Sequence, residues 1–159
     1  MLKTLFNLFR KTDKNSLETL QQRAEQGDAE AMYQLGRFYH IGEVVEADYD
    51  KAMTLYHRAN ALGYPLAANN IGALYDDMGE PEKSVEWFEQ GIRQDDKRAT
   101  INLGRFYLLG IGVGQDTFKG MQMLEKYDDD GFVLYLLAQV YDGVIGYGVP
   151  INYPKALEY

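Results

Sequence analysis

Three glycines spaced two residues apart could form a phosphate-binding loop. Gly110, Gly112 and Gly114 lie in the segment GIGVG. A dinucleotide-binding loop requires G-x-G-x-x-G after a strand, and a P-loop requires Gly-Lys followed by Ser or Thr. Neither pattern is present in this segment, so we interpret the glycines as a turn that joins two helices.

Consecutive acidic residues could bind calcium. Residues 128–130 are three aspartates followed by Gly131. An EF-hand loop that began here would need glycine at its sixth position and an acidic residue at its twelfth, but Val133 and Gln139 stand there. We expect a solvated turn instead, whose carboxylates lie near the N-terminus of the next helix, where the helix dipole favours negative charge.

Residues that commonly act as nucleophiles or metal ligands are scarce. The two histidines, His40 and His57, lack the H-x-x-x-H spacing of a zinc site, and there is no cysteine. The only serines are Ser16 and Ser84, and neither lies in a nucleophile-elbow sequence. We therefore expect no catalytic residue, no metal and no cofactor, and we expect that the chain is not an enzyme.

A five-residue motif recurs along the chain. LGRFY occurs at residues 35–39 and again at 103–107, with the related segments IGALY at 71–75 and LAQVY at 137–141. The spacings between successive copies are 36, 32 and 34 residues. A period in this range is typical of helical repeat proteins.

Each repeat reads as two helices, A and B, joined by a Gly-rich or acidic turn. Small residues in both helices allow their backbones to approach closely, and stacked hairpins cover the apolar face that each would expose alone. The pattern predicts an all-α fold, an α-solenoid of about four antiparallel helix hairpins. The expected helix pairs are 28–40 with 49–62, 65–78 with 81–93, 96–109 with 116–127, and 132–142 with a helix that begins near residue 153.

The order of these motifs resembles the Sel-one-like (Sel1-like) repeat family. Residues 24–42 and 48–64 carry its Gly-Asp, LG-x-x-Y and D-x-x-KA elements, and residues 110–120 and 146–157 carry its loop. The second repeat has a shorter turn and is more similar to the related tetratricopeptide repeat. The resemblance implies a protein-binding scaffold or adaptor made of one repeat domain, residues 16–159, with repeats at about 28–63, 65–94, 96–127 and 131–159.

Charge is unevenly distributed along the chain. The net charge is −8, yet the amphipathic N-terminal segment, residues 1–15, carries four basic residues against one acidic residue. We interpret this segment as a helix that caps the repeats, with an interfacial membrane anchor as the alternative. The acidic remainder repels phosphate, which argues against a nucleic-acid partner and favours a basic protein or peptide. The absence of cysteine is compatible with a cytoplasmic location.

The helix A face opposite helix B is the expected wall of a concave groove. Tyrosine and arginine often anchor interfaces, so Tyr33, Arg37, Arg105 and Tyr135 are the first candidates for partner contacts. On this basis Tyr33→Ala and Tyr135→Ala should weaken binding without loss of stability. The full set of predicted groove residues is Tyr33, Arg37, His40, Asn69, Asp76, Arg98, Arg105, Tyr135 and Gln139.

Two functional hypotheses stay open. The first is a non-catalytic scaffold that binds a protein or peptide in the groove, and the alternative is a cytosolic immunity protein, or antitoxin, that neutralises a basic bacterial toxin. A second candidate surface is acidic and comprises Glu43, Glu46, Asp48, Asp50, Asp76, Asp77, Glu80, Glu82, Glu86 and Glu89. We also expect a homodimer through the last repeat, because Ala156, Leu157 and Tyr159 begin a helix that ends before its next core position.

Overall fold

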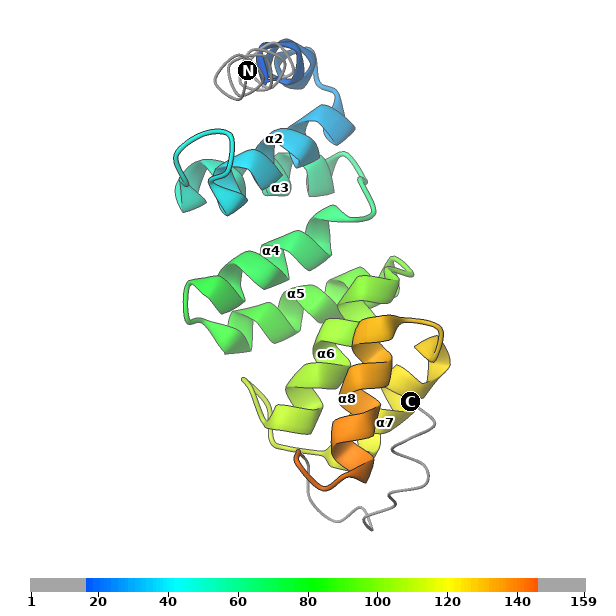
Figure 1. Cartoon of the computed structure of the whole chain (residues 1–159). Coiled ribbons are helices and arrows are strands. Elements are labelled where there is room, and N and C mark those ends of the chain that lie inside the picture. Colours follow the sequence, from blue (N-terminus) through cyan, green and yellow to red (C-terminus); the bar gives the residue numbers. More distant parts are fainter. Residues whose placement is uncertain (1–16, 146–159) are drawn as a thin grey trace, which may run out of the picture. The chain divides into compact units, whose positions relative to one another are not determined.

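The computed structural model describes residues 17–145, which contain helices and no strand (Figure 1). The helices agree with the predicted repeats to within a few residues, except that α4 begins at Ala67 instead of Pro65 and α7 is shortened by a 3₁₀ turn. The predicted N-terminal cap or anchor and the helix near residue 153 lie outside the described residues. After a helical segment at residues 17–25, the elements are α2 Ala29–Ile41, α3 Tyr49–Ala61, α4 Ala67–Asp77, α5 Pro81–Arg93, α6 Lys97–Leu109, α7 Thr117–Leu124, η1 Glu125–Tyr127 and α8 Gly131–Tyr141.

Aspartate side chains fix where most of these helices begin. In each case a carboxylate accepts a hydrogen bond from a backbone N–H of the first turn, which would otherwise have no partner. Such a cap stabilises a helix by about 1 kcal/mol. The capping residues are Asp28 of α2, Asp48 of α3, Asp96 of α6, Asp116 of α7 and Asp130 of α8.

The chain divides into two compact units, Met1–Leu74 and Tyr75–Tyr159, with the boundary inside α4. In the first unit, α2 packs against α3 to form the first hairpin. Ala52, Tyr56 and Ala59 are fully buried on α3, as the spacing of small and aromatic residues predicts.

In the second unit two apolar clusters hold the helices together. Phe88 of α5 meets Phe106 of α6 edge to face, with ring centroids 5.2 Å apart. A second cluster joins α6, α7 and α8 and includes Ile101, Leu108 and Leu124. Its members from α8 are Val133, Leu136, Leu137, Val140 and Tyr141.

Close contact between α6 and α7 depends on two glycines. A methyl group at Gly120 would stand 2.8 Å from the carbonyl oxygen of Gly104, and one at Gly104 would stand 2.9 Å from the Leu124 side chain. Because real Cβ atoms do not approach so closely, the helices can keep this separation only with glycine at the crossing. The predicted role of the small residues is therefore confirmed in this hairpin.

Among residues 17–145, no helix has the length and apolar character needed to cross a bilayer.

Candidate functional site

Two of the predicted groove residues are in the core. Tyr33 is only 4% exposed, and its ring packs 4.8 Å from that of Tyr64 and 6.0 Å from that of Tyr56. Asn69 is 5% exposed. Both residues lie three positions before the motif glycine, and neither presents an accessible side chain. The burial of Tyr33 argues against the expectation that it can be replaced without loss of stability.

Two other groove residues bind each other across neighbouring repeats. Arg105 of α6 donates a hydrogen bond to Asp76 at the end of α4, with a nitrogen to oxygen distance of 3.0 Å. Both side chains are half-buried. The ion pair links helix A of the second repeat to helix A of the third, so Arg105 has a structural role that the sequence did not reveal.

The remaining predicted groove residues differ in accessibility. Arg37 and Arg98 are exposed, and Arg98 lies 3.6 Å from the Asp96 carboxylate. His40 is half-buried, with Nδ1 3.3 Å from the Tyr56 hydroxyl. Tyr135 is 58% exposed, and its hydroxyl accepts a 2.7 Å hydrogen bond from Nε2 of Gln139.

A lysine lies over the motif tyrosine in each of the first three repeats. The ammonium groups are 5.1, 5.2 and 4.0 Å from the ring centroids. A backbone hydrogen bond also joins the two helices at each of these contacts. The N–H of the residue three positions before the lysine donates to the carbonyl oxygen of the motif tyrosine, and these donors are Asp48, Glu80 and Asp116. We call this arrangement the Lys–Tyr clasp, formed by Lys51 with Tyr39, Lys83 with Tyr75, and Lys119 with Tyr107.

The motif tyrosines differ in burial between the clasped repeats and the last repeat. Tyr39, Tyr75 and Tyr107 are half-buried under a cation, whereas Tyr141 is buried in the core. In the first repeat, the side-chain hydrogen bond between Asp48 and Lys51 lowers the pKa of the carboxyl group and raises the pKa of the ammonium group. An acidic residue three positions before the lysine, Asp48, Glu80 or Asp116, recurs in all three repeats, and it was the sequence signal from which this contact could have been predicted.

A shallow hollow of about 330 Å³ lies beside the first clasp. The rings and methyl groups of Tyr39 and Leu55 give it an apolar lining, and Asp50, Lys51 and Thr54 complete it. Lys51 is neutralised by Asp48, at 2.9 Å, whereas the exposed Asp50 carboxylate makes no ion pair within residues 17–145. The hollow could not be predicted from the sequence, because the repeat motif does not show that the Tyr39 side chain stays partly exposed.

Basic side chains are largely paired within the chain, and many acidic ones are not. Six of the eleven lysines and arginines in residues 17–145 form ion pairs, namely Arg23, Lys51, Lys83, Lys97, Arg98 and Arg105. Three exposed glutamates on α5, Glu82, Glu86 and Glu89, form no such pair in that range. The α5 carboxylates and those of Glu43, Glu46 and Asp50 are thus available to an outside cation.

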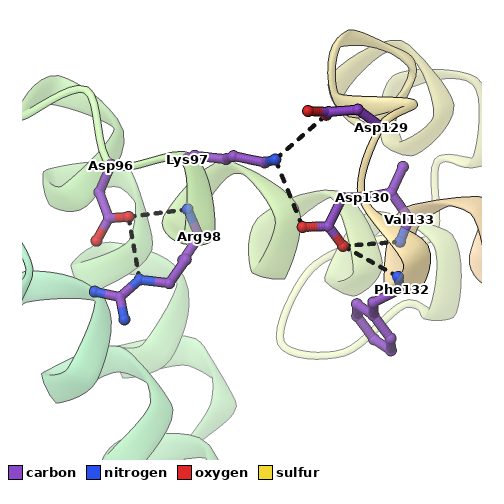
Figure 2. Close-up of polar contacts among 7 residues, drawn as sticks. All are labelled: Asp96, Lys97, Arg98, Asp129, Asp130, Phe132 and Val133. Atoms are coloured by element: carbon purple, nitrogen blue, oxygen red, sulfur yellow. Dashed lines mark hydrogen bonds and ion pairs between the residues drawn. The ribbon is translucent and has the colours of Figure 1, made fainter.

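The segments that imitate cofactor sites have structural roles. Gly112 has φ +64°, and a Cβ there would stand 2.6 Å from the carbonyl group of Pro81. Figure 2 shows Asp130 accepting hydrogen bonds from the N–H groups of Phe132 and Val133, while Lys97 reaches Asp130 and Asp129. Within residues 17–145 no three His, Asp or Glu side chains are grouped as metal ligands.

The histidines and the buried serine show no catalytic arrangement with each other in the described part of the chain. Burial lowers the pKa of His57 below its ordinary value. Ser84 is fully buried at the position that Ala52 and Gly120 occupy in neighbouring repeats, and its hydroxyl has no hydrogen-bond partner among residues 17–145.

Replacing Ser84 with alanine is expected to raise the free energy of unfolding by about 1 kcal/mol, because an unsatisfied buried hydroxyl carries a desolvation penalty that a methyl group avoids. Urea denaturation followed by circular dichroism measures the change. A decrease of about 1 kcal/mol in the free energy of unfolding would contradict this prediction, because it would show that the Ser84 hydroxyl makes a stabilising hydrogen bond.

Comparison with known proteins identifies the repeats. The model described as Sel1 repeat matches residues 29–64, 65–96, 97–126 and 133–159. Chitin synthase regulatory factor 4 of Schizosaccharomyces pombe is 32% identical over 121 residues, which cover 72% of this chain and 19% of that protein. The chain thus spans less than a fifth of this relative's length.

Two solved structures are similar over most of the chain. A protective antigen of uropathogenic Escherichia coli with an SLR fold has a TM-score of 0.73 and 27% identity, and the match covers 89% of this chain and 31% of that one. An immunity protein of Pseudomonas aeruginosa has a TM-score of 0.61 and 25% identity, with 90% and 54% coverage. These similarities confirm the predicted all-α repeat solenoid.

Proposed function

Because the chain belongs to the Sel1 repeat family, whose members are helical scaffolds that bind other proteins, we propose that it is a non-catalytic scaffold for a basic protein or peptide. The proposed site is the hollow beside Tyr39 and Leu55 together with its acidic rim, Glu43, Glu46 and Asp50. We refer to it as the repeat-one site. A cytoplasmic location is part of the proposal.

The observation that carries this proposal is the unpaired Asp50 carboxylate beside an apolar surface. A lysine or arginine side chain has an apolar stem and a charged end. Its stem can cover Tyr39 and Leu55 while its charge meets Asp50. Glu43 and Glu46, both exposed in the loop after α2, add negative potential that attracts a basic partner and speeds association.

The groove residues that keep accessible side chains extend the proposal. Arg37, in the same unit as the repeat-one site, is exposed and is proposed as a further partner contact. Arg98 is exposed in the second unit and stays a separate prediction. His40, half-buried beside Tyr49 and Tyr56, is a weaker candidate because its ring already packs edge to face on both.

Neutralising the rim with Glu43→Gln, Glu46→Gln and Asp50→Asn is expected to weaken partner capture by about tenfold, since three exposed ion pairs together contribute roughly that factor. Affinity purification from the native host with quantitative mass spectrometry measures the loss. We expect the captured partner to be basic and to dissociate as salt increases. Unchanged capture by the rim variant, or an acidic partner, would contradict the proposed site.

The α5 face provides a control of equal charge. Glu82→Gln, Glu86→Gln and Glu89→Gln also remove three unpaired carboxylates, and this variant is expected to retain capture. If both triple variants lost partner capture equally, binding would depend on the net charge of the chain and not on the repeat-one site.

An immunity function is the second candidate, and the similarity to the Pseudomonas aeruginosa immunity protein favours it. A toxin that arrives at the repeat-one site would be covered there by direct contact. If this is the function, the captured partner is a basic toxin and co-expression of the chain restores growth. A captured partner that has no effect on growth would exclude this candidate and leave the scaffold proposal in place.

A further inference from the structure

The N-terminal segment, residues 1–15, has the composition that the repeat-one site favours in a partner. The segment has four basic residues against one acidic residue, whereas the rest of the chain is strongly acidic. It is also rich in large apolar side chains. The basic residues are Lys3, Arg10, Lys11 and Lys14, and the apolar ones include Leu2, Leu5, Phe6, Leu8 and Phe9.

The surface around the hollow is more apolar than one basic side chain needs. Ile41, the last residue of α2, is 52% exposed, and Tyr49, the first residue of α3, is 39% exposed. These two residues stand at the two ends of the loop that carries Glu43 and Glu46. A ligand with several apolar residues as well as positive charge therefore removes more apolar surface from water here than an isolated lysine or arginine does.

The length of the segment lets it reach the hollow. An extended chain of fifteen residues spans up to about 50 Å. The first unit, Met1–Leu74, contains both the segment and the hollow, and a compact body of about 60 residues is roughly 30 Å across. Contact between the two therefore needs no particular arrangement of the first unit relative to the second.

Covalent attachment favours the segment over an outside ligand of the same composition. A short tether gives the attached group an effective concentration on the order of millimolar at a site within its reach. Exposed ion pairs are individually weak, but several of them together with apolar contacts are enough to fill a site at that concentration.

We propose that residues 1–15 occupy the repeat-one site of the same chain and must leave it before a basic partner binds. The apolar side chains of the segment cover Tyr39 and Leu55, and its basic residues meet Asp50 and the two loop glutamates. The inference rests on the proposed function, since it uses the same site. A site that its own segment fills nine-tenths of the time binds an outside partner about tenfold more weakly.

Carbodiimide cross-linking of the full chain tests the contact. The reagent activates a carboxylate, a lysine amine that is close enough displaces the activated group to form an amide bond, and the carbodiimide leaves as its urea. We expect such links between the three lysines of the segment and the three rim carboxylates, Glu43, Glu46 and Asp50, identified by mass spectrometry of the monomeric product.

The carboxylates of α5 are the internal control for this experiment. Glu82, Glu86 and Glu89 are also exposed and belong to the second unit, so they report random collisions of the segment. Equal yields at the two sets of carboxylates, or no link at the rim, would overturn the proposal and leave a bilayer surface as the alternative partner of the segment. Links that join ¹⁴N-labelled to ¹⁵N-labelled chains in a mixture would also overturn it.

A fluorescent peptide with the sequence of residues 1–15 tests whether the site is filled. In the full chain, Arg10→Gln with Lys11→Gln is expected to bind this peptide about threefold more tightly than the wild type, because loss of two ion pairs empties the site more often. Arg93→Gln with Lys126→Gln removes the same charges from exposed positions of the second unit and should leave the affinity unchanged. Equal gains in the two variants, or no gain in the first, would contradict the proposal.

The contact of the segment and the proposed function can fail separately. If the cross-links form at the rim but the rim variant captures as much host partner as the wild type, the proposed function fails and the segment contact stands. If the rim variant loses partner capture but no cross-link forms at the rim, the segment contact fails and the repeat-one site stands.

Discussion

Replacing Tyr33 with alanine is expected to lower the free energy of unfolding by about 3–5 kcal/mol, the range for removal of a buried aromatic side chain. The ring is 4% exposed and packs against Tyr56 and Tyr64, so its loss leaves a cavity beside these two rings. The surrounding helices can collapse into that space only in part. Urea denaturation monitored by circular dichroism measures the change.

Tyr135→Ala is the matched control, because it removes the same side chain at the same repeat position. The Tyr135 ring is mostly exposed, and we expect its loss to change stability by less than about 0.5 kcal/mol. The comparison is made at protein concentrations too low for self-association. Similar losses in the two variants would contradict the difference in burial that separates these positions.

Gly112→Ala is expected to destabilise the chain by about 2–5 kcal/mol, for two separate reasons. An alanine at φ +64° costs roughly 1–2 kcal/mol because its Cβ crowds the following carbonyl. The same Cβ would stand 2.6 Å from the Pro81 carbonyl, and forced repacking of this kind costs about 1–3 kcal/mol. Thermal and urea unfolding of the variant measure the combined effect.

Gly114→Ala is the matched control in the same loop. A Cβ at Gly114 meets no atom within 4 Å, and we expect stability to stay within about 1 kcal/mol of the wild type or to rise slightly, because alanine restricts the unfolded chain. If Gly112→Ala proved as stable as Gly114→Ala, the loop would not be held against α5 as described.

The fold could be predicted from the sequence because its signals are local and repeated. Each LG-x-x-Y copy marks a helix A, an aspartate marks the start of most helices, and small residues mark the crossings. Periodicity was less informative where the chain departs from regular geometry. The helix after Pro65 starts two residues late, and α7 ends in a 3₁₀ turn after Leu124.

The predicted groove residues were less reliable because helical periodicity identifies a face but not its neighbour. Tyr33 and Tyr135 have the same residue type and the same register, yet Tyr33 is 4% exposed and Tyr135 is 58% exposed. Arg105 binds Asp76, which stands 29 residues earlier in the chain. No local pattern encodes such a contact, since it depends on how successive helices are stacked.

The Lys–Tyr clasps have a consequence for how such chains can be recombined. Both partners of each clasp lie within one hairpin, as Lys51 and Tyr39 do, so a whole hairpin can be gained, lost or transplanted without separating them. A crossover placed between hairpins, near Gly63 or Asp95, keeps every clasp together. A crossover in the loop between Tyr107 and Lys119 divides one, and chimaeras cut there would need a donor whose own lysine reaches the same ring.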